Sequence, residues 1–216
     1  MYRAVLFDLD GTLTDSGPGI MNCVQYALEK IGRPEPDVQK LRVFVGPPMI
    51  RQFMDYAGID EDEARQAVVY YRERYVPTGI FENSVYPGMS ELLAFLKAKG
   101  YKVAVASSKP EFMVKTVLEH FELLQYFDEL VGAAPDGSLT DKADVIREAM
   151  RRLGIPDERK KEVLMIGDTR YDVEGAGKAG VDCVAVAYGY GDKRDLEAAA
   201  PLRIVDTVEE LKDFFC

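Results

Sequence analysis

The chain has 216 residues, enough for one large domain or for one domain that carries a smaller insert. Its formal net charge is −10, and a field of that sign repels nucleic acid and anionic membrane surfaces, so neither is an expected partner. The same field repels phosphate, so any anion site has to be built locally from lysines, backbone N–H groups or a metal ion.

The cysteines and the apolar segments indicate the compartment. Cys23, Cys183 and Cys216 are odd in number and follow no C-x-x-C spacing, which favours a reducing compartment. The N-terminus has no segment of the signal-peptide type, and no apolar stretch reaches the ~18 residues that a membrane span needs. We therefore expect an unprocessed, cytoplasmic chain.

The first part of the chain predicts one strand followed by helices. Tyr2–Phe7 is a short apolar run that ends abruptly in Asp8-Leu9-Asp10-Gly11 and is typical of a buried strand. Ser16–Gly19 reads as a breaker. Helical periodicity then follows in three stretches, and no convincing strand is present in residues 15–85. We predict an all-helical insert over 15–85, with helices near residues 20–31, 49–56 and 61–75.

Beyond Pro87-Gly88 strands and helices alternate. Alternation of this length predicts a parallel sheet covered on both faces, an α/β core of residues 1–14 and 86–216. The expected helices are 89–99, 111–120, 142–153 and one that ends at Gly180; the expected strands are 101–106, 129–131, 163–166, 183–186 and 203–205.

Polar side chains gather where these strands end. Ligands of such sheets bind at the carboxyl ends of the strands, so the chemistry is expected there. Two of these ends supply carboxylates and two regions supply groups that bind phosphate. The residues are Asp8, Asp10, Ser107, Ser108, Lys109, Lys142, Asp168 and Asp172.

These residues resemble the four motifs of the haloacid dehalogenase superfamily, in its phosphoglycolate-phosphatase-like and 5′-nucleotidase-like branch. The run from Asp8 to Ser16 matches the first motif, Ser107 the second, Lys142 the third, and Gly167-Asp168 with Asp172 the fourth. The resemblance spans nearly the whole chain in the right order and spacing. It implies a Rossmann-like doubly wound core with an inserted all-helical cap domain.

The carboxylates can also be interpreted from chemistry. Attack on a phosphomonoester needs a nucleophile, a proton for the leaving alkoxide and positive charge near the phosphoryl oxygens. Asp8 stands directly after its strand and is the expected nucleophile. Asp10 is the expected general acid and base, a role worth ~10²–10⁴ in rate. We expect Mg²⁺ as cofactor, held by Asp8, by Asp10 through its backbone carbonyl, and by Asp168 and Asp172, although Asp172 also fits a simple helix cap after Thr169.

The phosphate-binding set is expected around the same strand ends. It consists of Gly11, Thr12, Ser107, Ser108, Lys109 and Lys142. A lysine in the first turn of a helix opposes the helix dipole by ~0.3–1 kcal/mol, which makes sense for Lys142 if an anion lies there. Ser108-Lys109-Pro110-Glu111 fits a capping box. Lys109 also fits a solvated surface side chain.

The expected function is Mg²⁺-dependent hydrolysis of small phosphate esters such as 2-phosphoglycolate through an aspartyl-phosphate on Asp8. Gly46 and Arg51, in the insert, are the expected contacts to the leaving group. Three alternatives stay open: a 5′-nucleotidase, a phosphomutase, and a phosphate- or nucleotide-binding module without turnover. Gly175-x-Gly177-x-x-Gly180 matches a dinucleotide fingerprint but lies too far after its strand to act as one. The protein is expected as a monomer or homodimer.

Overall fold

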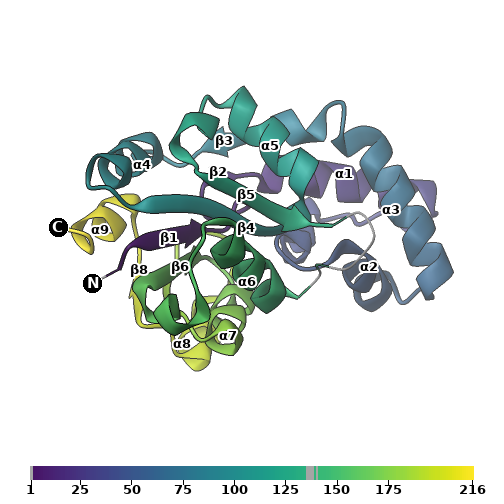
Figure 1. The fold of residues 1–216 in the computed structure, drawn as a ribbon. Coiled ribbons are helices and arrows are strands. Elements are labelled where there is room, and N and C mark those ends of the chain that lie inside the picture. The colour runs from purple at the N-terminus through teal and green to yellow at the C-terminus, as the bar shows by residue number, and fades with distance from the viewer. Residues whose placement is uncertain (1, 135–138, 140) are drawn as a thin grey trace. The chain divides into compact units, whose positions relative to one another are not determined.

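The computed structural model describes residues 2–134, 139 and 141–216. They form two compact units (Figure 1). Unit 1 contains the residues up to Thr14 and Val85–Cys216, and unit 2 contains Asp15–Ser84. Two short strands, β2 (Thr14–Asp15) and β3 (Ser84–Val85), pair with each other where the chain passes from one unit to the other.

Unit 1 is built on a six-stranded sheet. Every pairing in it is parallel, and the strand order is β5-β4-β1-β6-β7-β8. The prediction of a doubly wound parallel α/β core is confirmed. The strands are β1 (Ala4–Phe7), β4 (Lys102–Pro110), β5 (Glu129–Ala133), β6 (Val163–Gly167), β7 (Asp182–Val186) and β8 (Arg203–Val205).

The central strands are apolar because helices cover the sheet on both sides. All four residues of β1 and all five of β6 are buried. Helices α6 and α7 pack on one face in a single apolar cluster, while α4 and α5 lie on the other (Figure 1). The helices of unit 1 are α4 (Met89–Ala98), α5 (Glu111–His120), α6 (Lys142–Arg152), α7 (Arg170–Ala179), α8 (Lys193–Ala199) and α9 (Val208–Asp213), with short 3₁₀ turns at Leu124–Tyr126 and Asp157–Glu162.

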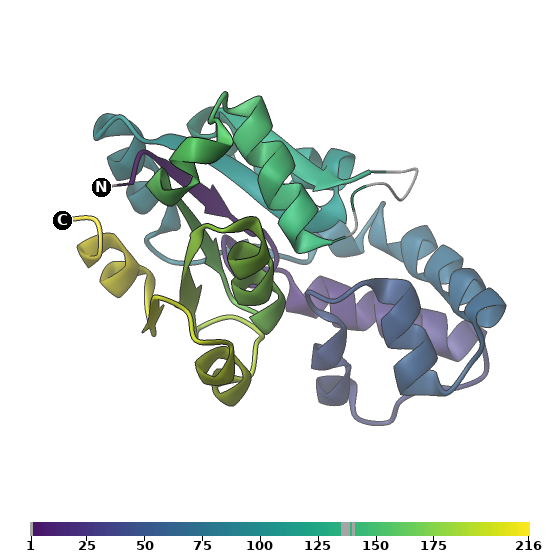
Figure 2. The same ribbon diagram turned by 60° about the horizontal axis from the view of Figure 1, so that its bottom comes forward.

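The C-terminal segment lies at one edge of the sheet. Strand β8 pairs with β7 alone within the described sheet, and α9 packs against α4. Figure 2 shows this yellow segment beside the sheet, and in both ribbon views α9 lies near the start of β1. The ring of Tyr2 stacks 6.2 Å from that of Phe214, which fastens this end of unit 1.

Unit 2 is helical apart from the single strand residues at its two ends. Helix α1 packs on α3, and α2 packs on α3. Tyr71 and Tyr75 stack at 4.9 Å and are buried, so they are packing residues of this unit. The elements are α1 (Gly17–Lys30), α2 (Met49–Ala57) and α3 (Glu61–Tyr75), with 3₁₀ turns at Val38–Phe44 and Gly79–Phe81.

Two local predictions are wrong, and one helix was not predicted. Ser16–Gly19 does not break the chain, because α1 begins at Gly17 with Pro18 in its first turn, where a missing N–H costs nothing. Ser108 does not cap α5: β4 runs on irregularly to Pro110, which is itself the N-cap. Helix α8 was not expected, because its seven residues offer too short an apolar pattern.

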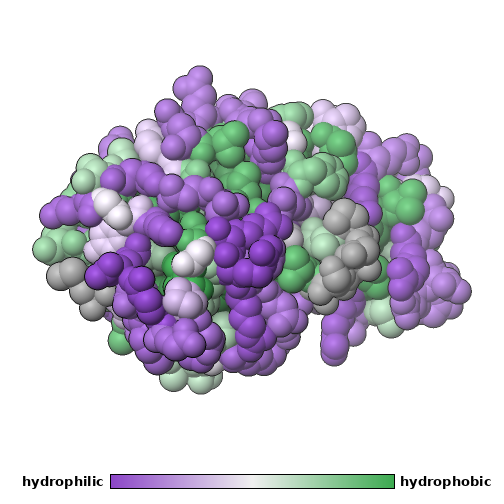
Figure 3. All heavy atoms as spheres, in the orientation of Figure 1, coloured by the Kyte–Doolittle hydropathy of each residue, from purple (hydrophilic) through white to green (hydrophobic). Residues whose placement is uncertain are grey.

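The described surface is rich in charged side chains. Hydrophilic residues dominate the face shown in Figure 3, as expected for a chain with 30% charged residues. Among the described helices, none combines the length and the apolar character required to cross a membrane.

Candidate active site

Three carboxylates meet at the carboxyl ends of β1 and β6. Asp8 follows β1, Asp168 follows β6, and Asp172 lies in the first turn of α7. Each offers a ligand oxygen, and the three oxygens lie within 4.8 Å of one another. Because β1 and β6 are parallel neighbours, their last residues necessarily come together at this edge.

Lys142 reaches into this carboxylate cluster from the start of α6. Its ammonium lies 2.9 Å from Asp8 Oδ1 and 2.8 Å from Asp172 Oδ1, and it donates to the carbonyl of Ala106 at 3.1 Å. The ammonium therefore lies close to three oxygens, two of carboxylates and one of the backbone. The side chains of Lys142 and Asp8 are each only 7% exposed, so the pair is shielded from water. The two carboxylates therefore offset the unfavourable interaction between the Lys142 ammonium and the helix dipole.

Burial sets the charge balance of the cluster. Desolvation raises the pKa of Asp8 to about 6, against the lowering effect of Lys142. Desolvation and then the neighbouring Asp172 raise the pKa of Asp168 well above its usual value. Desolvation lowers the pKa of Lys142, but Asp172 and Asp8 more than offset it, so the net shift is upward. Three carboxylates thus share one ammonium.

The donor set fits a hard divalent cation. Asp8 Oδ1 and Asp172 Oδ1 are buried and make no hydrogen bond of good geometry, although the ammonium of Lys142 is close to both. Carboxylate oxygens in such numbers, with more negative than positive charge, are what Mg²⁺ or a similar ion binds. Asp8, Asp168 and Asp172 are the residues that would hold it.

Asp168 is fixed by contacts on every side. Thr12 donates its hydroxyl to Oδ1 at 3.2 Å, and the backbone N–H of Tyr190 donates to Oδ2 at 2.7 Å. A Cβ on Gly11, which has φ +82°, or on Gly189 would collide with the Asp168 side chain. The carboxylate therefore needs glycine at both positions.

The loop after β7 completes this part of the site and was missed by sequence reasoning. Besides the Tyr190 bond, Tyr188 donates its hydroxyl to the carbonyl of Thr12 at 3.0 Å. A Cβ on Gly191 would collide with the carbonyl oxygen of Asp168. The sequence did hold a signal for this loop, since residues 188–191 follow a strand of the same sheet after one intervening residue.

Asp172 uses its two oxygens differently. Oδ2 accepts from the backbone N–H of Thr169 at 3.0 Å and from its hydroxyl at 2.7 Å, as the second half of a capping box. Oδ1 faces Lys142. Asp172 therefore both caps its helix and takes part in the carboxylate cluster.

Asp10 and Lys109 form a second buried pair. The ammonium of Lys109 lies 3.0 and 2.8 Å from the two carboxylate oxygens of Asp10, and both residues are 8% exposed. Lys109 is therefore not a solvated surface side chain. Ser107 is buried and its hydroxyl accepts from the Lys109 N–H at 3.3 Å, while Ser108 is half-buried in the irregular end of β4.

The two residues expected to contact the leaving group, Gly46, with φ +103°, and Arg51, belong to unit 2. The Arg51 side chain is 82% exposed and pairs with Asp55 at 3.5 Å. Gly175 and Gly177 lie inside α7 and Gly180 ends it, so the glycine run forms no strand-to-helix phosphate loop.

Comparison with known proteins places the site in a family. The family model described as "Haloacid dehalogenase-like hydrolase" matches residues 5–186. A 5′-nucleotidase of Pseudomonas aeruginosa is 42% identical over 200 residues, which are 93% of this chain and 89% of that protein. Tyrosine-protein kinase PtkA of Mycobacterium tuberculosis is 39% identical, covering 98% of this chain and 72% of the relative.

Relatives named phosphoglycolate phosphatase also match most of the chain. A phosphoglycolate phosphatase of Pseudomonas savastanoi pv. phaseolicola is 32% identical over 97% of this chain and 78% of that protein. Among solved structures, one described as "a predicted phosphatase from Clostridium acetobutylicum" superimposes with a TM-score of 0.94 at 45% identity, covering 100% of this chain and 98% of the other. The resemblance inferred from the motifs is confirmed.

Proposed function

The chain belongs to the haloacid dehalogenase-like hydrolases, and we propose that it is a phosphatase that cleaves phosphomonoesters through a phosphorylated Asp8. The observation that carries this proposal is the placement of Asp8. It is a buried carboxylate at the end of the central strand, fixed at Oδ1 by Lys142, with two further carboxylates within reach of the same point. A site that only bound phosphate would gain nothing from three carboxylates.

The proposed reaction has two steps. The Lys142 contact is to Oδ1, so we assign attack to Oδ2 of Asp8, which bonds to phosphorus while the bond from phosphorus to the ester oxygen breaks. Asp10 gives a proton to the leaving alkoxide. Water then attacks phosphorus, Asp10 takes a proton from that water, and phosphate leaves with Asp8 restored as a carboxylate. Lys109 holds the Asp10 carboxyl group for both transfers.

The proposal includes a requirement for Mg²⁺. Asp8, Asp168 and Asp172 would hold the ion. When bound, it would supply positive charge beside the transferring phosphoryl group. The chain's own part is to keep Asp168 rigid through Thr12 and Tyr190, and to keep Lys142 charged beside Asp8.

For the substrate, we propose small phosphate esters, with 2-phosphoglycolate as the reference compound. Relatives named phosphoglycolate phosphatase support this choice. A second candidate, nucleoside 5′-monophosphates, is supported by the higher identity to the relative named 5′-nucleotidase. In the first case we propose that Arg51, an exposed cation of unit 2, recognises the carboxylate of the leaving group.

The test compares Asp8→Asn with the wild-type protein on an aryl phosphate, 2-phosphoglycolate and 5′-AMP, with Mg²⁺ and with excess chelator. Asp144→Asn is the matched control, because it is the same isosteric change on an exposed carboxylate of α6. Wild type and Asp144→Asn should release phosphate, and acid quenching should trap a phosphorylated protein that Asp8→Asn lacks.

Activity of Asp8→Asn within about tenfold of wild type would sink the nucleophile assignment, since an amide cannot form the acyl phosphate. Full activity in excess chelator would show that the reaction requires no metal ion. Transfer of phosphate from ATP to a tyrosine peptide, with no hydrolysis of any ester, would instead favour the activity named for PtkA.

A further inference from the structure

A cavity opens in unit 1 at the opposite end of the sheet from the carboxylate cluster. Its volume is about 650 Å³, within the range of small-molecule sites. It lies where β1 and β4 begin and just before β6 begins, whereas the candidate active site lies where they end. We call it the strand-start cavity; it is lined by Tyr2, Arg3, Lys99, Gly100, Tyr101, Lys102, Gly154, Ile155, Arg159, Glu162, Phe215 and Cys216.

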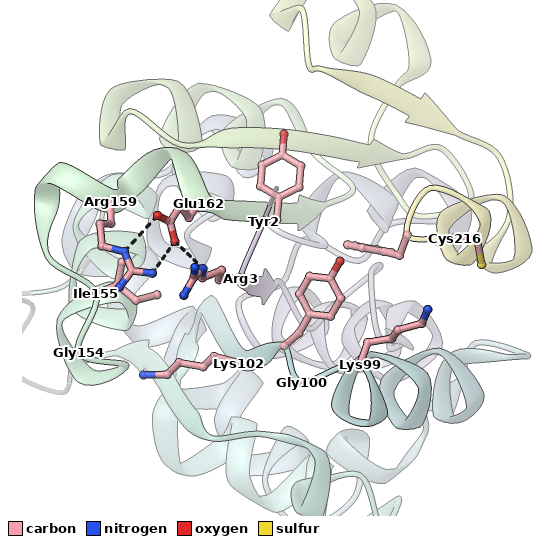
Figure 4. Close-up of a pocket in the computed structure, with 12 residues that line it drawn as sticks. Tyr2, Arg3, Lys99, Gly100, Lys102, Gly154, Ile155, Arg159, Glu162 and Cys216 are labelled. Carbon is pink, nitrogen blue, oxygen red and sulfur yellow. Dashed lines mark hydrogen bonds and ion pairs between the residues drawn. The ribbon is translucent and has the colours of Figure 1, made fainter.

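The lining of the strand-start cavity is basic although the chain is acidic. Four cationic side chains and one carboxylate line it, while acidic residues outnumber Lys and Arg by 37 to 27 in the whole chain. Figure 4 shows Arg3 and Arg159 meeting at Glu162 on one side, with Lys99 across from them. Glu162 lies 3.2 Å from Arg3 and is bound by Arg159 as well, so one carboxylate serves two guanidiniums.

The two lysines have no carboxylate partner among the described residues. Lys102 donates to the carbonyl of Leu153 at 2.5 Å, and Lys99 lies 5.4 Å from the ring centre of Phe95. Lys99 follows the last residue of α4, where a cation suits the helix dipole. The helix dipole does not account for Arg3 or Lys102, which lie at the starts of strands. The excess of positive charge is therefore available to a ligand.

Aromatic rings line the same cavity. Tyr2, Tyr101 and Phe215 are each partly exposed, and they are packed by neighbouring rings: Tyr101 meets Phe215 edge-on at 5.6 Å. The backbone N–H groups of Gly100 and Tyr101 are already bonded to α4 carbonyls. Recognition would thus come from side chains: cations for phosphate oxygens and rings for a planar base.

We propose that the strand-start cavity binds a nucleoside diphosphate, with its phosphates on Arg3, Lys99, Lys102 and Arg159 and its base against the tyrosine rings. This site is separate from the carboxylate cluster, and the proposal does not depend on the phosphatase function. The excess of three positive charges suits a diphosphate, and the ring-lined part of the cavity suits the base.

Cys216 provides a local readout, because it lines the cavity and is exposed, whereas Cys23 and Cys183 are buried. Alkylation of Cys216 by iodoacetamide is followed by mass spectrometry in excess chelator, with ADP as the probe and its integrity checked by chromatography. At an ADP concentration about ten times its Kd, alkylation should slow about tenfold. Adenosine alone and pyrophosphate alone should protect only at higher concentrations.

Lys99→Glu and Lys30→Glu form a matched pair, since both lysines lie at the C-terminal end of a helix and over a ring, at 5.4 and 5.2 Å, but only Lys99 lines the cavity. Lys99→Glu should weaken ADP protection about tenfold or more, Lys99→Arg should keep it, and Lys30→Glu should leave it unchanged. If thermal unfolding shows that Lys99→Glu is misfolded, Lys99→Gln is used in its place.

Three results would overturn the proposal. The first is no protection of Cys216 by ADP. The second is an equal loss of ADP protection in Lys99→Glu and Lys30→Glu, which would mean that the overall charge of the protein alone attracts ADP. The third is protection by pyrophosphate at the same concentration as ADP, which would remove the nucleoside from the assignment.

Discussion

Gly175 and Lys142 meet where α7 packs against α6: a Cβ on Gly175 would lie 2.7 Å from both the Cβ and the Cγ of Lys142. Real Cβ atoms do not approach other atoms so closely, so one of the two helices would have to move. Since Lys142 carries the ammonium that contacts Asp8 and Asp172, the glycine fixes the position of a charge in the candidate active site.

Replacing Gly175 with alanine should therefore damage both stability and activity. Overpacking of this kind costs ~1–3 kcal/mol, and a displaced Lys142 should lower kcat by about tenfold or more. Gly177→Ala is the matched control in the same helix, because nothing lies within 4 Å of its Cβ. It should stabilise by up to ~1 kcal/mol, as alanine does over glycine in helices. Urea unfolding measures the stability of each variant, and phosphate release measures its activity. Equal behaviour of Gly175→Ala and Gly177→Ala would contradict the close approach of Gly175 to Lys142.

Gly11→Ala should weaken metal binding through Asp168. Alanine at φ +82° carries backbone strain of ~1–2 kcal/mol, and its methyl group would also push the Asp168 carboxylate. Gly32→Ala supplies the comparison, since Gly32 has φ +73° but open space around its Cβ. Both should lose stability, but only Gly11→Ala should need more Mg²⁺ for half-maximal activity. An unchanged Mg²⁺ requirement would show that Asp168 does not depend on Gly11.

Much of the fold was predictable because each signal was local. The apolar run before Asp8 and the alternation after Pro87 identify a parallel α/β core, and α3 and α5 begin and end where their periodicity predicts. The strand-end rule then brings Asp8 and Asp168 together without any knowledge of contacts, whereas Lys142, at the start of a helix, was expected there from the resemblance and from the helix dipole.

The misses involve partners distant in the chain. Lys109 was expected among the phosphate-binding residues, but its contact with Asp10 was not predicted, because the two residues lie 99 positions apart in the chain. The glycines at 175 and 189 are required by close approaches that no local pattern encodes. The false cap at Ser108 has a different cause: the irregular extension of β4 to Pro110 depends on pairing with β5, which propensity alone cannot foresee.

Thr169→Ala and Asp172→Asn should separate the two uses of the Asp172 carboxylate. Thr169→Ala removes the capping hydroxyl and should cost ~0.5–2 kcal/mol of stability with a modest change in rate. Asp172→Asn keeps an amide oxygen that can accept the Thr169 N–H but removes the charge facing Lys142. It should keep most stability and lose most activity. Thermal unfolding and kcat on an aryl phosphate give the comparison, and parallel losses in both variants would argue against two roles.

Lys109→Ala should leave the Asp10 carboxylate buried without its cation. Removing one partner of a buried pair costs ~3–5 kcal/mol, and losing the fixed acid–base group should lower kcat by ~10²–10⁴. Lys115→Ala, on the exposed face of α5, is the control and should change neither quantity beyond ~0.5 kcal/mol. If Lys109 only attracted substrate, KM would rise while kcat stayed constant, and the positioning role would be refuted.

The central position of β1 has a consequence for how the protein assembles. Its neighbours pair with Ala4 through Lys102 and Val163, so β1 is synthesised long before the two strands that pair with it. Unit 2, a continuous stretch of chain, has all its contacts available much earlier. Parallel pairings at such separation form slowly, and a bare apolar strand is exposed meanwhile. The residues that carry the proposed chemistry are thus among the last to be put in place.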